Sequence, residues 1–151
     1  MKTWKSLLLF LCATFAVASI GAVAPPDAWF AALNKPAFNP PSWVFAPVWT
    51  LLYVLMAVAA WRVYVRRSFD RALVCWCVQL ALNAVWSPIF FRWHDLFAAV
   101  VDIVALLIAI LITTLLFWRR DRIAAGLMLP YVLWVGFATV LAVTIWRINT
   151  A

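Results

Sequence analysis

The sequence contains few of the residues on which common hydrolytic enzymes depend. Glutamate is absent, and the 151 residues include five acidic side chains, one histidine, three cysteines and three glycines. No serine or cysteine has a base near it in the sequence, so nothing indicates an activated nucleophile. The sequence therefore argues against a conventional enzyme and predicts no catalytic residue.

The three cysteines do not form a metal-binding pattern. Cys75 and Cys77 are two positions apart, so on a helix their side chains point to different faces, and Cys12 is isolated. Buried apolar cysteines are the simpler interpretation. We therefore predict no metal site and no required cofactor.

Charged residues are also scarce, and apolar residues take their place. Charged residues make up 11% of the chain and hydrophobic residues 69%, with a mean hydropathy of +1.04, far from the composition of soluble domains. A helix crosses the hydrocarbon core with about 20 residues, and apolar runs of this length lie at about 5–24, 43–65, 72–91, 96–118 and 124–146. None alternates with the period of two of a membrane β-strand. The sequence predicts an all-α, multi-pass integral membrane protein, with residues 1–151 in a single bundle of five transmembrane helices.

The cations are distributed unequally between the two ends of this predicted bundle. One end has Lys35, Arg92 and Arg147. The other end has Lys2, Lys5, Arg62, Arg66, Arg67, Arg71, Arg119, Arg120 and Arg122. The positive-inside rule then predicts a cytoplasmic N-terminus and an external C-terminus. The net charge of +7 does not indicate nucleic-acid binding, because these cations lie singly or in threes at helix ends, where they contact lipid headgroups.

Residues 25–42, PPDAWFAALNKPAFNPPS, form the one long connection of the predicted bundle and carry five prolines. A loop of this length in a compact bundle is usually functional or disordered. Asp27 can cap a short helix that ends near Leu33, with Trp29, Phe30 and Leu33 on one face. This apolar face either covers the open end of the bundle or lies on the lipid interface, and the sequence leaves both interpretations open.

Three segments, NKPAFNPPSWVFAPVWTLLYVLM, QLALNAVWSPIFF and LPYVLWVGFATVLAVTIWRIN, lie in this order on the second, third and fifth predicted helices. Together they resemble the TspO/MBR family, the tryptophan-rich sensory proteins of bacteria and the mitochondrial translocator protein. The resemblance covers nearly the whole chain. It implies a bacterial five-helix membrane protein, commonly a homodimer, whose long first loop closes a pocket that accepts porphyrins such as protoporphyrin IX or haem.

This resemblance implies a tetrapyrrole-binding receptor with a sensory, regulatory or transport-associated role, and it places Trp49 and Trp134 in or beside the pocket. Some bacterial members promote light- and oxygen-dependent porphyrin breakdown through matching tryptophans, which implies photochemistry at Trp49 and Trp134 as an alternative function. A small ion-coupled transporter that uses Asp102 is a third hypothesis. The sterol-recognition pattern of the mitochondrial proteins has a tyrosine where LAVTIWR has Val143, which argues against sterol binding there.

The depth of each tryptophan in its span separates two groups. Six lie near predicted helix ends, where the interfacial belt explains them: Trp4, Trp43, Trp61, Trp93, Trp118 and Trp146. Trp49 and Trp134 lie deeper, where an indole N–H needs a partner. Trp49 shares a helical face with Tyr53 and Met56, and a second face combines Trp134, Phe137, Ala138 and Leu141. These faces fit a ligand pocket and an ordinary packed core equally well.

Polar residues inside the predicted spans are the remaining candidates. Gln79 and Asn83 lie one turn apart, and Trp86 extends their face, which predicts an interhelical hydrogen-bond seam, with ligand contact as the second interpretation. Asp102 lies about two turns into its span, where an ionisable side chain is a functional hypothesis by default. We expect an ion pair between Asp102 and Arg147 in preference to a proton or ion relay.

The ligand hypothesis can be stated by residue. The predicted ligand-binding residues are Trp49, Tyr53, Asn83, Trp86, Trp134, Phe137, Ala138 and Leu141. A dianionic porphyrin would stack on the tryptophans and keep its carboxylates near water, with Lys35 and Arg92 as charge partners. Three prolines that interrupt predicted spans, Pro47, Pro88 and Pro130, would kink the helices and leave gaps. Small-residue pairs such as Ala18 with Ala22 and Ala105 with Ala109 permit close helix packing within the bundle or in the homodimer.

Overall fold

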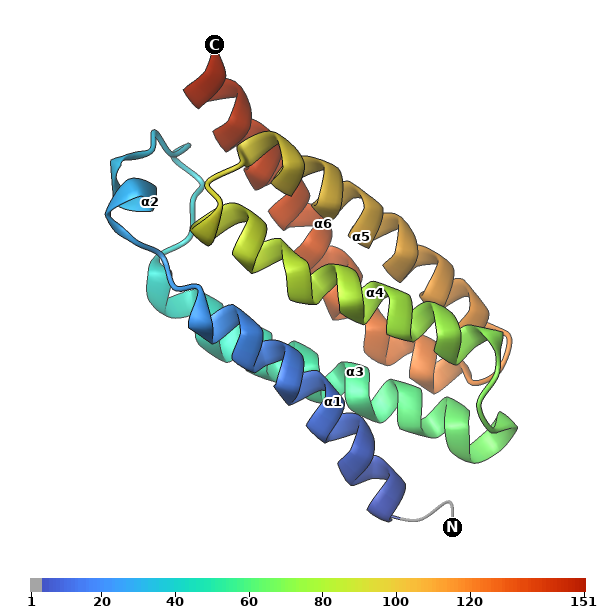
Figure 1. Cartoon of the computed structure of the whole chain (residues 1–151). Coiled ribbons are helices and arrows are strands. Elements are labelled where there is room, and N and C mark those ends of the chain that lie inside the picture. Colours follow the sequence, from blue (N-terminus) through green and yellow to red (C-terminus); the bar gives the residue numbers. More distant parts are fainter. Residues whose placement is uncertain (1–3) are drawn as a thin grey trace.

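The computed structural model describes residues 4–151, which fold as helices joined by short connections (Figure 1). The elements in chain order are α1 (Trp4–Val23), α2 (Ala28–Ala32), η1 (Ser42–Val44), α3 (Phe45–Arg67), α4 (Arg71–Ser87), η2 (Pro88–Arg92), α5 (Leu96–Trp118) and α6 (Arg122–Thr150). Within these residues five helices are long and apolar enough to cross a membrane, and no strand occurs. The predicted all-α bundle of five spans is confirmed. Lys2 lies outside the described residues.

Four of the five aspartates start helices. The side chains of Asp27, Asp70, Asp95 and Asp121 each accept a hydrogen bond from a backbone N–H in the first turn of the helix that follows. An aspartate in this position satisfies N–H groups that have no partner inside the helix, and its charge complements the helix dipole. The acidic residues therefore fix where α2, α4, α5 and α6 begin, and Asp102 is the exception.

Two of the three prolines expected to interrupt spans lie within them, and Pro47 does not. Pro47 is the third residue of α3 and lies in its first turn, where a missing N–H removes little, so the expectation of a break there was wrong. Pro88 opens the π-helical turn η2, and Pro130 lies inside α6. The two prolines inside spans thus lie where α4 passes into η2 and in the first half of α6.

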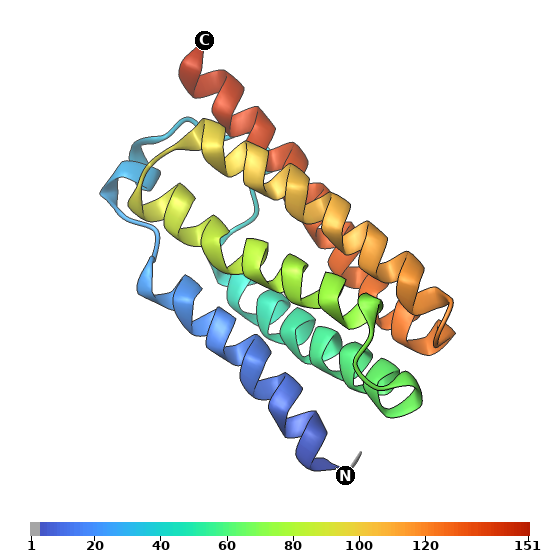
Figure 2. The same ribbon diagram turned by 45° about the vertical axis from the view of Figure 1, so that its right-hand side comes forward.

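The five long helices pack side by side in the cyclic order α1, α3, α6, α5, α4. Figure 2 shows that α2 and the loop around it lie at the end of the bundle that also holds the C-terminus, whereas the N-terminal helix starts at the opposite end. We call residues 25–42, which include α2, the lid, and we call the end of the bundle that holds them the lid end. The opposite end is called the arginine end, because the described members of the larger group of predicted cations, which does not include Arg92 or Arg147, lie there.

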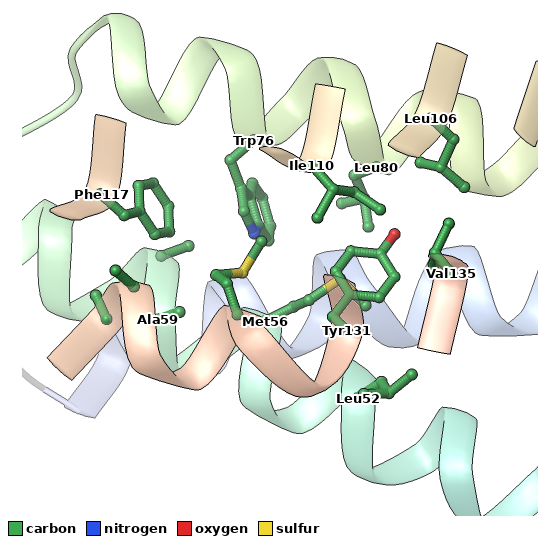
Figure 3. Packing of buried hydrophobic residues seen from close by; sticks show 14 of the residues in the cluster. Leu52, Met56, Ala59, Trp76, Leu80, Leu106, Ile110, Phe117, Tyr131 and Val135 are labelled. Atoms are coloured by element: carbon green, nitrogen blue, oxygen red, sulfur yellow. The ribbon is translucent and has the colours of Figure 1, made fainter. Parts of the chain in front are cut away.

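The packed core fills the bundle toward the arginine end. Figure 3 shows side chains from α3, α4, α5 and α6 converging there, among them Met56, Trp76, Phe117 and Tyr131. Alanines of α3 such as Ala59 are fully buried, which lets the neighbouring helices approach closely. The larger core cluster therefore occupies this part of the bundle, and a smaller buried cluster lies beneath α2.

Candidate functional site

A cavity of about 670 Å³ lies beneath the lid and is lined by residues of all five long helices and of the loop around α2. This volume falls within the range of about 300–1,000 Å³ that is usual for small-molecule sites. Seven of the eight predicted ligand-binding residues line it: Trp49, Tyr53, Asn83, Trp86, Trp134, Ala138 and Leu141. The two faces that the sequence placed on separate helices thus meet in one cavity, although their role in binding stays a prediction.

Phe137, the eighth predicted residue, does not line the cavity. Its ring centroid lies 5.7 Å from that of Trp134 and 6.3 Å from that of Phe38 in the lid loop. Phe137 lies at the edge of the α6 face that includes Ala138 and Leu141, and its side chain points toward the loop that carries Phe38. Phe137 therefore supports Trp134 and the lid rather than facing the interior.

The cavity also has lining residues that the sequence did not indicate. Phe15, Ala18 and Ala22 of α1 form one wall, and Phe90 and Phe91 of η2 contribute beside the lid. The first helix shows almost no amphipathic pattern in the sequence, because apolar residues surround it on every side. Its cavity face could not be distinguished from its lipid face without the positions of its neighbours. Ala18 and Ala22 both line the cavity, and Ala18 also packs against the core.

The lid covers the mouth of this cavity. In α2, the Asp27 carboxylate accepts a hydrogen bond from the N–H of Phe30 at 3.0 Å. Trp29, Phe30 and Leu33 pack on a buried cluster that consists of Phe90, Ala99, Leu141 and Ile145. Of the two interpretations of residues 25–42, the cover over the open end of the bundle is therefore confirmed, and the lipid-lying segment is excluded.

Two sets of contacts, one on either side of α2, hold the lid on the bundle. At the first, Nε2 of His94 lies 2.9 Å from Oδ2 of Asp27, and the His94 ring stacks on Trp29 with a centroid distance of 4.2 Å. At the second, the N–H of Asn34 donates to Oδ1 of Asn149, and Nδ2 of Asn149 donates to the carbonyl of Asn34, both at 2.9 Å. The backbone N–H of Phe30 and, next, His94 hold the pKa of Asp27 below its usual value. The lid is thus attached to the turn before α5 and to the end of α6.

Comparison with known proteins now gives the family. The model of the TspO/MBR family matches residues 7–147. The chain belongs to this family. A tryptophan-rich sensory protein of Cereibacter sphaeroides is 38% identical over 146 residues, which cover 97% of this chain and 92% of the relative. Protein CrtK of Rhodobacter capsulatus is 35% identical over 145 residues, 93% of this chain and 91% of the relative. The translocator protein of Homo sapiens is 36% identical over 126 residues, 80% of this chain and 75% of the relative.

The polar seam of this TspO/MBR protein forms the floor of the cavity. The Tyr53 hydroxyl donates to Oδ1 of Asn83, Nδ2 of Asn83 donates to the Tyr131 hydroxyl, and that hydroxyl donates to Oε1 of Gln79, each at 2.8 Å. Trp86 instead donates from its indole N–H to the carbonyl of Ala99 at 3.2 Å. The predicted interhelical seam is confirmed, and it joins α3, α4 and α6. Tyr131 was missed although it lies one turn before Trp134 on the same helix.

The two deep tryptophans of this family member differ from Trp86 in their polar atoms. Trp49 lies against Tyr53 with a centroid distance of 5.5 Å, and Trp134 lies against Phe45 at 5.8 Å. Within residues 4–151, neither indole N–H donates to the protein, and neither nitrogen is fully buried. The expectation that both tryptophans face the bundle interior agrees with their place in the cavity wall, and a partner for each N–H stays a prediction. Both residues line the cavity. The cavity walls therefore include two indole N–H groups that donate no hydrogen bond to the described protein.

The predicted charge partners do not reach the cavity. Nζ of Lys35 donates to the carbonyls of Phe30, Ala31 and Leu33 at 2.6, 3.3 and 3.2 Å, and lies 4.5 Å from the centre of the Phe30 ring. This ammonium therefore satisfies the carbonyl end of α2, where a cation is favourable. Arg92 is exposed and also does not line the cavity. Their contact with a ligand stays a prediction, and the geometry gives Lys35 a structural role in the lid.

Asp102 does not form the ion pair that was expected with Arg147. Among the described residues, the buried Oδ2 atom of Asp102 has no hydrogen-bond partner, and the salt bridges do not include this residue. Trp146 packs on Phe97 at 5.6 Å, so Arg147 lies level with the start of α5, whereas Asp102 is five residues deeper, roughly 7–8 Å along the helix. Arg147 is also exposed, so depth and direction both separate the two side chains.

No set of three or more potential metal ligands comes together in the part of the chain that the structure describes. Cys12, Cys75 and Cys77 are free thiols, and the interpretation as buried cysteines was wrong, because Cys12 and Cys77 lie exposed on the outside of the bundle and Cys75 is half-buried. The chemical character of the site is accordingly aromatic and apolar, with a hydrogen-bonded floor and two unpaired indole donors. It suits a flat, largely apolar ligand that carries a few acceptor atoms.

Proposed function

We propose that this TspO/MBR protein binds a tetrapyrrole, protoporphyrin IX or haem, in the cavity beneath α2 and acts as a membrane-embedded receptor with a sensory, regulatory or transport-associated role. The observation that carries the proposal is the meeting of Trp49, Trp134 and Trp86 in one lidded cavity of about 670 Å³. Aromatic rings stack on a flat macrocycle with about 0.5–1.5 kcal/mol per pair beyond area burial. The names of the relatives, sensory protein and translocator protein, agree with a receptor rather than with a conventional enzyme.

The position of the polar groups favours one orientation of such a ligand. Charged carboxylates are costly to bury without partners, and the cavity floor is formed by Tyr53 and Asn83, which already bond to each other. The mouth is lined by Asn39 and Ser42 of the lid loop, which supply polar groups near water. The macrocycle therefore lies deep and the carboxylates point toward the lid.

Absorbance titration of the detergent-solubilised protein with protoporphyrin IX tests this proposal. We expect saturable binding of one porphyrin per chain, with a spectrum distinct from porphyrin in empty micelles. Fluorescence quenching is less suitable, because eleven tryptophans cannot be assigned individually. Porphyrin that partitions into protein-free micelles and protein-containing micelles alike would contradict the proposal.

A second candidate function is light- and oxygen-dependent breakdown of the bound porphyrin. Contacts between Trp49 and two tyrosines favour it, because the centroid of Trp49 lies 5.5 Å from Tyr53 and 6.3 Å from Tyr131. Such a chain of oxidisable rings gives an excited ligand neighbours with which to exchange an electron. Illumination of the complex in air separates the two functions: a receptor returns the porphyrin unchanged, whereas a degrading protein yields a new product that is lost in Trp49→Phe.

The lid fastening predicts a kinetic effect. Asn149→Ala removes both hydrogen bonds that join α6 to Asn34, and hydrogen bonds of this kind contribute about 0.5–1.5 kcal/mol each. We expect porphyrin to dissociate roughly tenfold faster, and backbone amides in residues 25–42 to exchange hydrogen faster even without ligand. Thr150→Ala is the matched control, because this hydroxyl bonds within its own helix, to the carbonyl of Trp146. Equal exchange rates in the parent and in Asn149→Ala would show that this contact does not hold the lid.

A further inference from the structure

A second concavity lies at the arginine end of the bundle, opposite the lid. It encloses about 330 Å³ and is lined by Arg67, Asp70, Arg119 and Arg120. These residues come from the turn between α3 and α4 and from the turn between α5 and α6. Two connections far apart in the sequence therefore contribute three guanidinium groups to one small depression. Nothing in the tetrapyrrole site at the opposite end requires this arrangement.

Local structure fixes the position of these side chains. Helix α3 ends after Arg67 because Ser68 adopts a positive φ of 62°, and Asp70 then caps α4. Oδ2 of Asp70 accepts a hydrogen bond from Nε of Arg120 at 2.8 Å, while Oδ1 accepts one from the N–H of Ala72 at 2.9 Å. Partial burial alone would raise the pKa of Asp70, but the bonds from Arg120 and Ala72 outweigh it and lower the pKa. Asp70 thus remains ionised and holds Arg120 in place.

The other two arginines of the depression have no acidic partner. The remaining acid at this end, Asp121, is already bonded to Nε of Arg62 at 2.9 Å and to Nε of Arg66 at 3.2 Å. Within residues 4–151, no salt bridge or hydrogen bond involves the guanidinium of Arg67 or Arg119. Three arginines against one aspartate leave the depression with a net charge of +2. The guanidinium groups of Arg67 and Arg119 are thus free to bind an anion.

The depression opens at the level of the lipid headgroups. Trp118 directly precedes Arg119 and is 55% exposed, and the guanidinium of Arg122 lies 5.4 Å from its ring centre. Exposed tryptophans at the ends of spanning helices mark the membrane interface. Leu115, one turn earlier on α5, is 66% exposed and faces where acyl chains would lie. An anion in the depression therefore has a water-facing side and an apolar helix surface beside it.

We propose that the depression lined by Arg67, Asp70, Arg119 and Arg120 binds the phosphate of an anionic phospholipid headgroup. Arginine matches phosphate well, because its planar fork donates two parallel hydrogen bonds to one group. Arg67 and Arg119 contact the phosphate oxygens, and Asp70 acts as a positioning residue that orients Arg120. The charge distribution predicts that this end faces the cytoplasmic leaflet, where anionic lipids attract basic segments. The bound lipid would fix the two turns relative to each other.

The test compares two variants of equal charge. In Arg67→Gln/Arg119→Gln both free arginines of the depression are neutralised. In the control, Arg71→Gln/Arg122→Gln, two exposed arginines of the same end are neutralised, and neither lines the depression. Short-chain phosphatidylglycerol is titrated onto the detergent-solubilised protein, and lipid-bound chains are counted by native mass spectrometry. Because a direct charge-assisted hydrogen bond to phosphate is stronger than the screened attraction of a nearby exposed charge, we expect the first variant to bind roughly thirtyfold more weakly and the control to lose less than about twofold.

Two further titrations of the parent protein identify the source of the anion. Phosphatidylcholine should bind at least about tenfold more weakly than phosphatidylglycerol to the parent protein, because its choline cation is repelled by the arginines. Inorganic phosphate at millimolar concentration should not displace the lipid, and if it does so fully, the depression is a site for free phosphate and the lipid assignment is wrong. Equal losses in the two variants would show a diffuse charge effect and would also overturn the proposal. Circular dichroism of both variants confirms that their helical content equals that of the parent.

Discussion

Replacement of both Trp49 and Trp134 by alanine is expected to weaken protoporphyrin IX binding at least about a hundredfold. Truncation of a buried tryptophan at the centre of an interface costs about 2 kcal/mol or more, and the two tryptophans line one cavity from α3 and α6. The loss removes stacking area and also two indole donors that have no partner in residues 4–151. Each single variant should lose roughly thirtyfold, since about 2 kcal/mol is lost and 1.4 kcal/mol corresponds to about a factor of ten.

The chain offers a matched control for this result. Trp43 and Trp118 are 75% and 55% exposed and lie outside the cavity, so their replacement by alanine removes two tryptophans without touching the site. Absorbance titration of the control should give the affinity of the parent protein. If the Trp49→Ala/Trp134→Ala protein keeps its helical content and still binds with unchanged affinity, the porphyrin lies elsewhere and both residues serve the core.

Features that depend on one helix at a time could be predicted from the sequence. Hydropathy gave the five spans to within a few residues of their ends, because each apolar run must cross the same thickness of hydrocarbon. The cap at Asp27 was predictable because the carboxylate bonds to an N–H three residues later. Helical spacing likewise placed Trp49 with Tyr53, and Trp134 with Ala138, on faces that line the cavity.

Features that depend on how helices meet could not be predicted in this way. The lid fastenings join Asp27 to His94 and Asn34 to Asn149, residues 67 and 115 positions apart, and no local pattern pairs them. Asp102 was misassigned because position along a span indicates depth but not direction around the helix or the offset of the neighbouring helix. The ammonium of Lys35 was assigned to a ligand although the predicted short helix offered its carbonyl end as a nearer partner, and only the structure shows that Lys35 turns back onto that end.

The second large effect concerns stability at the arginine end. Asp121 caps α6 through the N–H of Ile123 at 2.9 Å and is 4% exposed. Its Oδ2 also accepts a hydrogen bond from Nε of Arg62 and forms an ion pair with Nε of Arg66. Asp121→Ala is expected to lower the free energy of unfolding by about 2–3 kcal/mol, of which the cap accounts for about 1 and the charge-assisted bonds for the rest. This estimate lies below the loss for fully buried pairs, because Arg62 and Arg66 are partly exposed and regain water.

Asp95→Ala is the control for this substitution, because Asp95 caps α5 through Ala98 at 2.9 Å but is exposed and has no arginine partner within the described chain. It should lose about 1 kcal/mol, the value of the cap alone. Equal losses in the two variants, measured by urea unfolding in mixed micelles, would show that Arg62 and Arg66 add nothing.

The pH dependence gives an independent check on the same residue. Burial alone would raise the pKa of Asp121, but hydrogen bonds from Arg62 and from the N–H groups of Ile123 and Ala124 outweigh it and hold the pKa below the ordinary value of 3.8. Because the pKa is lower in the folded protein than in the unfolded chain, the ionised carboxylate stabilises the fold fully at pH values above the unfolded pKa. This stabilisation is lost as the pH falls through the lower pKa of the folded protein. Asp121→Asn keeps an acceptor for the cap and removes the titrating charge. The difference in unfolding free energy between the parent and Asp121→Asn should therefore be constant near neutral pH and shrink below about pH 4, whereas a difference that stays constant down to the acid limit would mean that the carboxylate charge does not stabilise this turn.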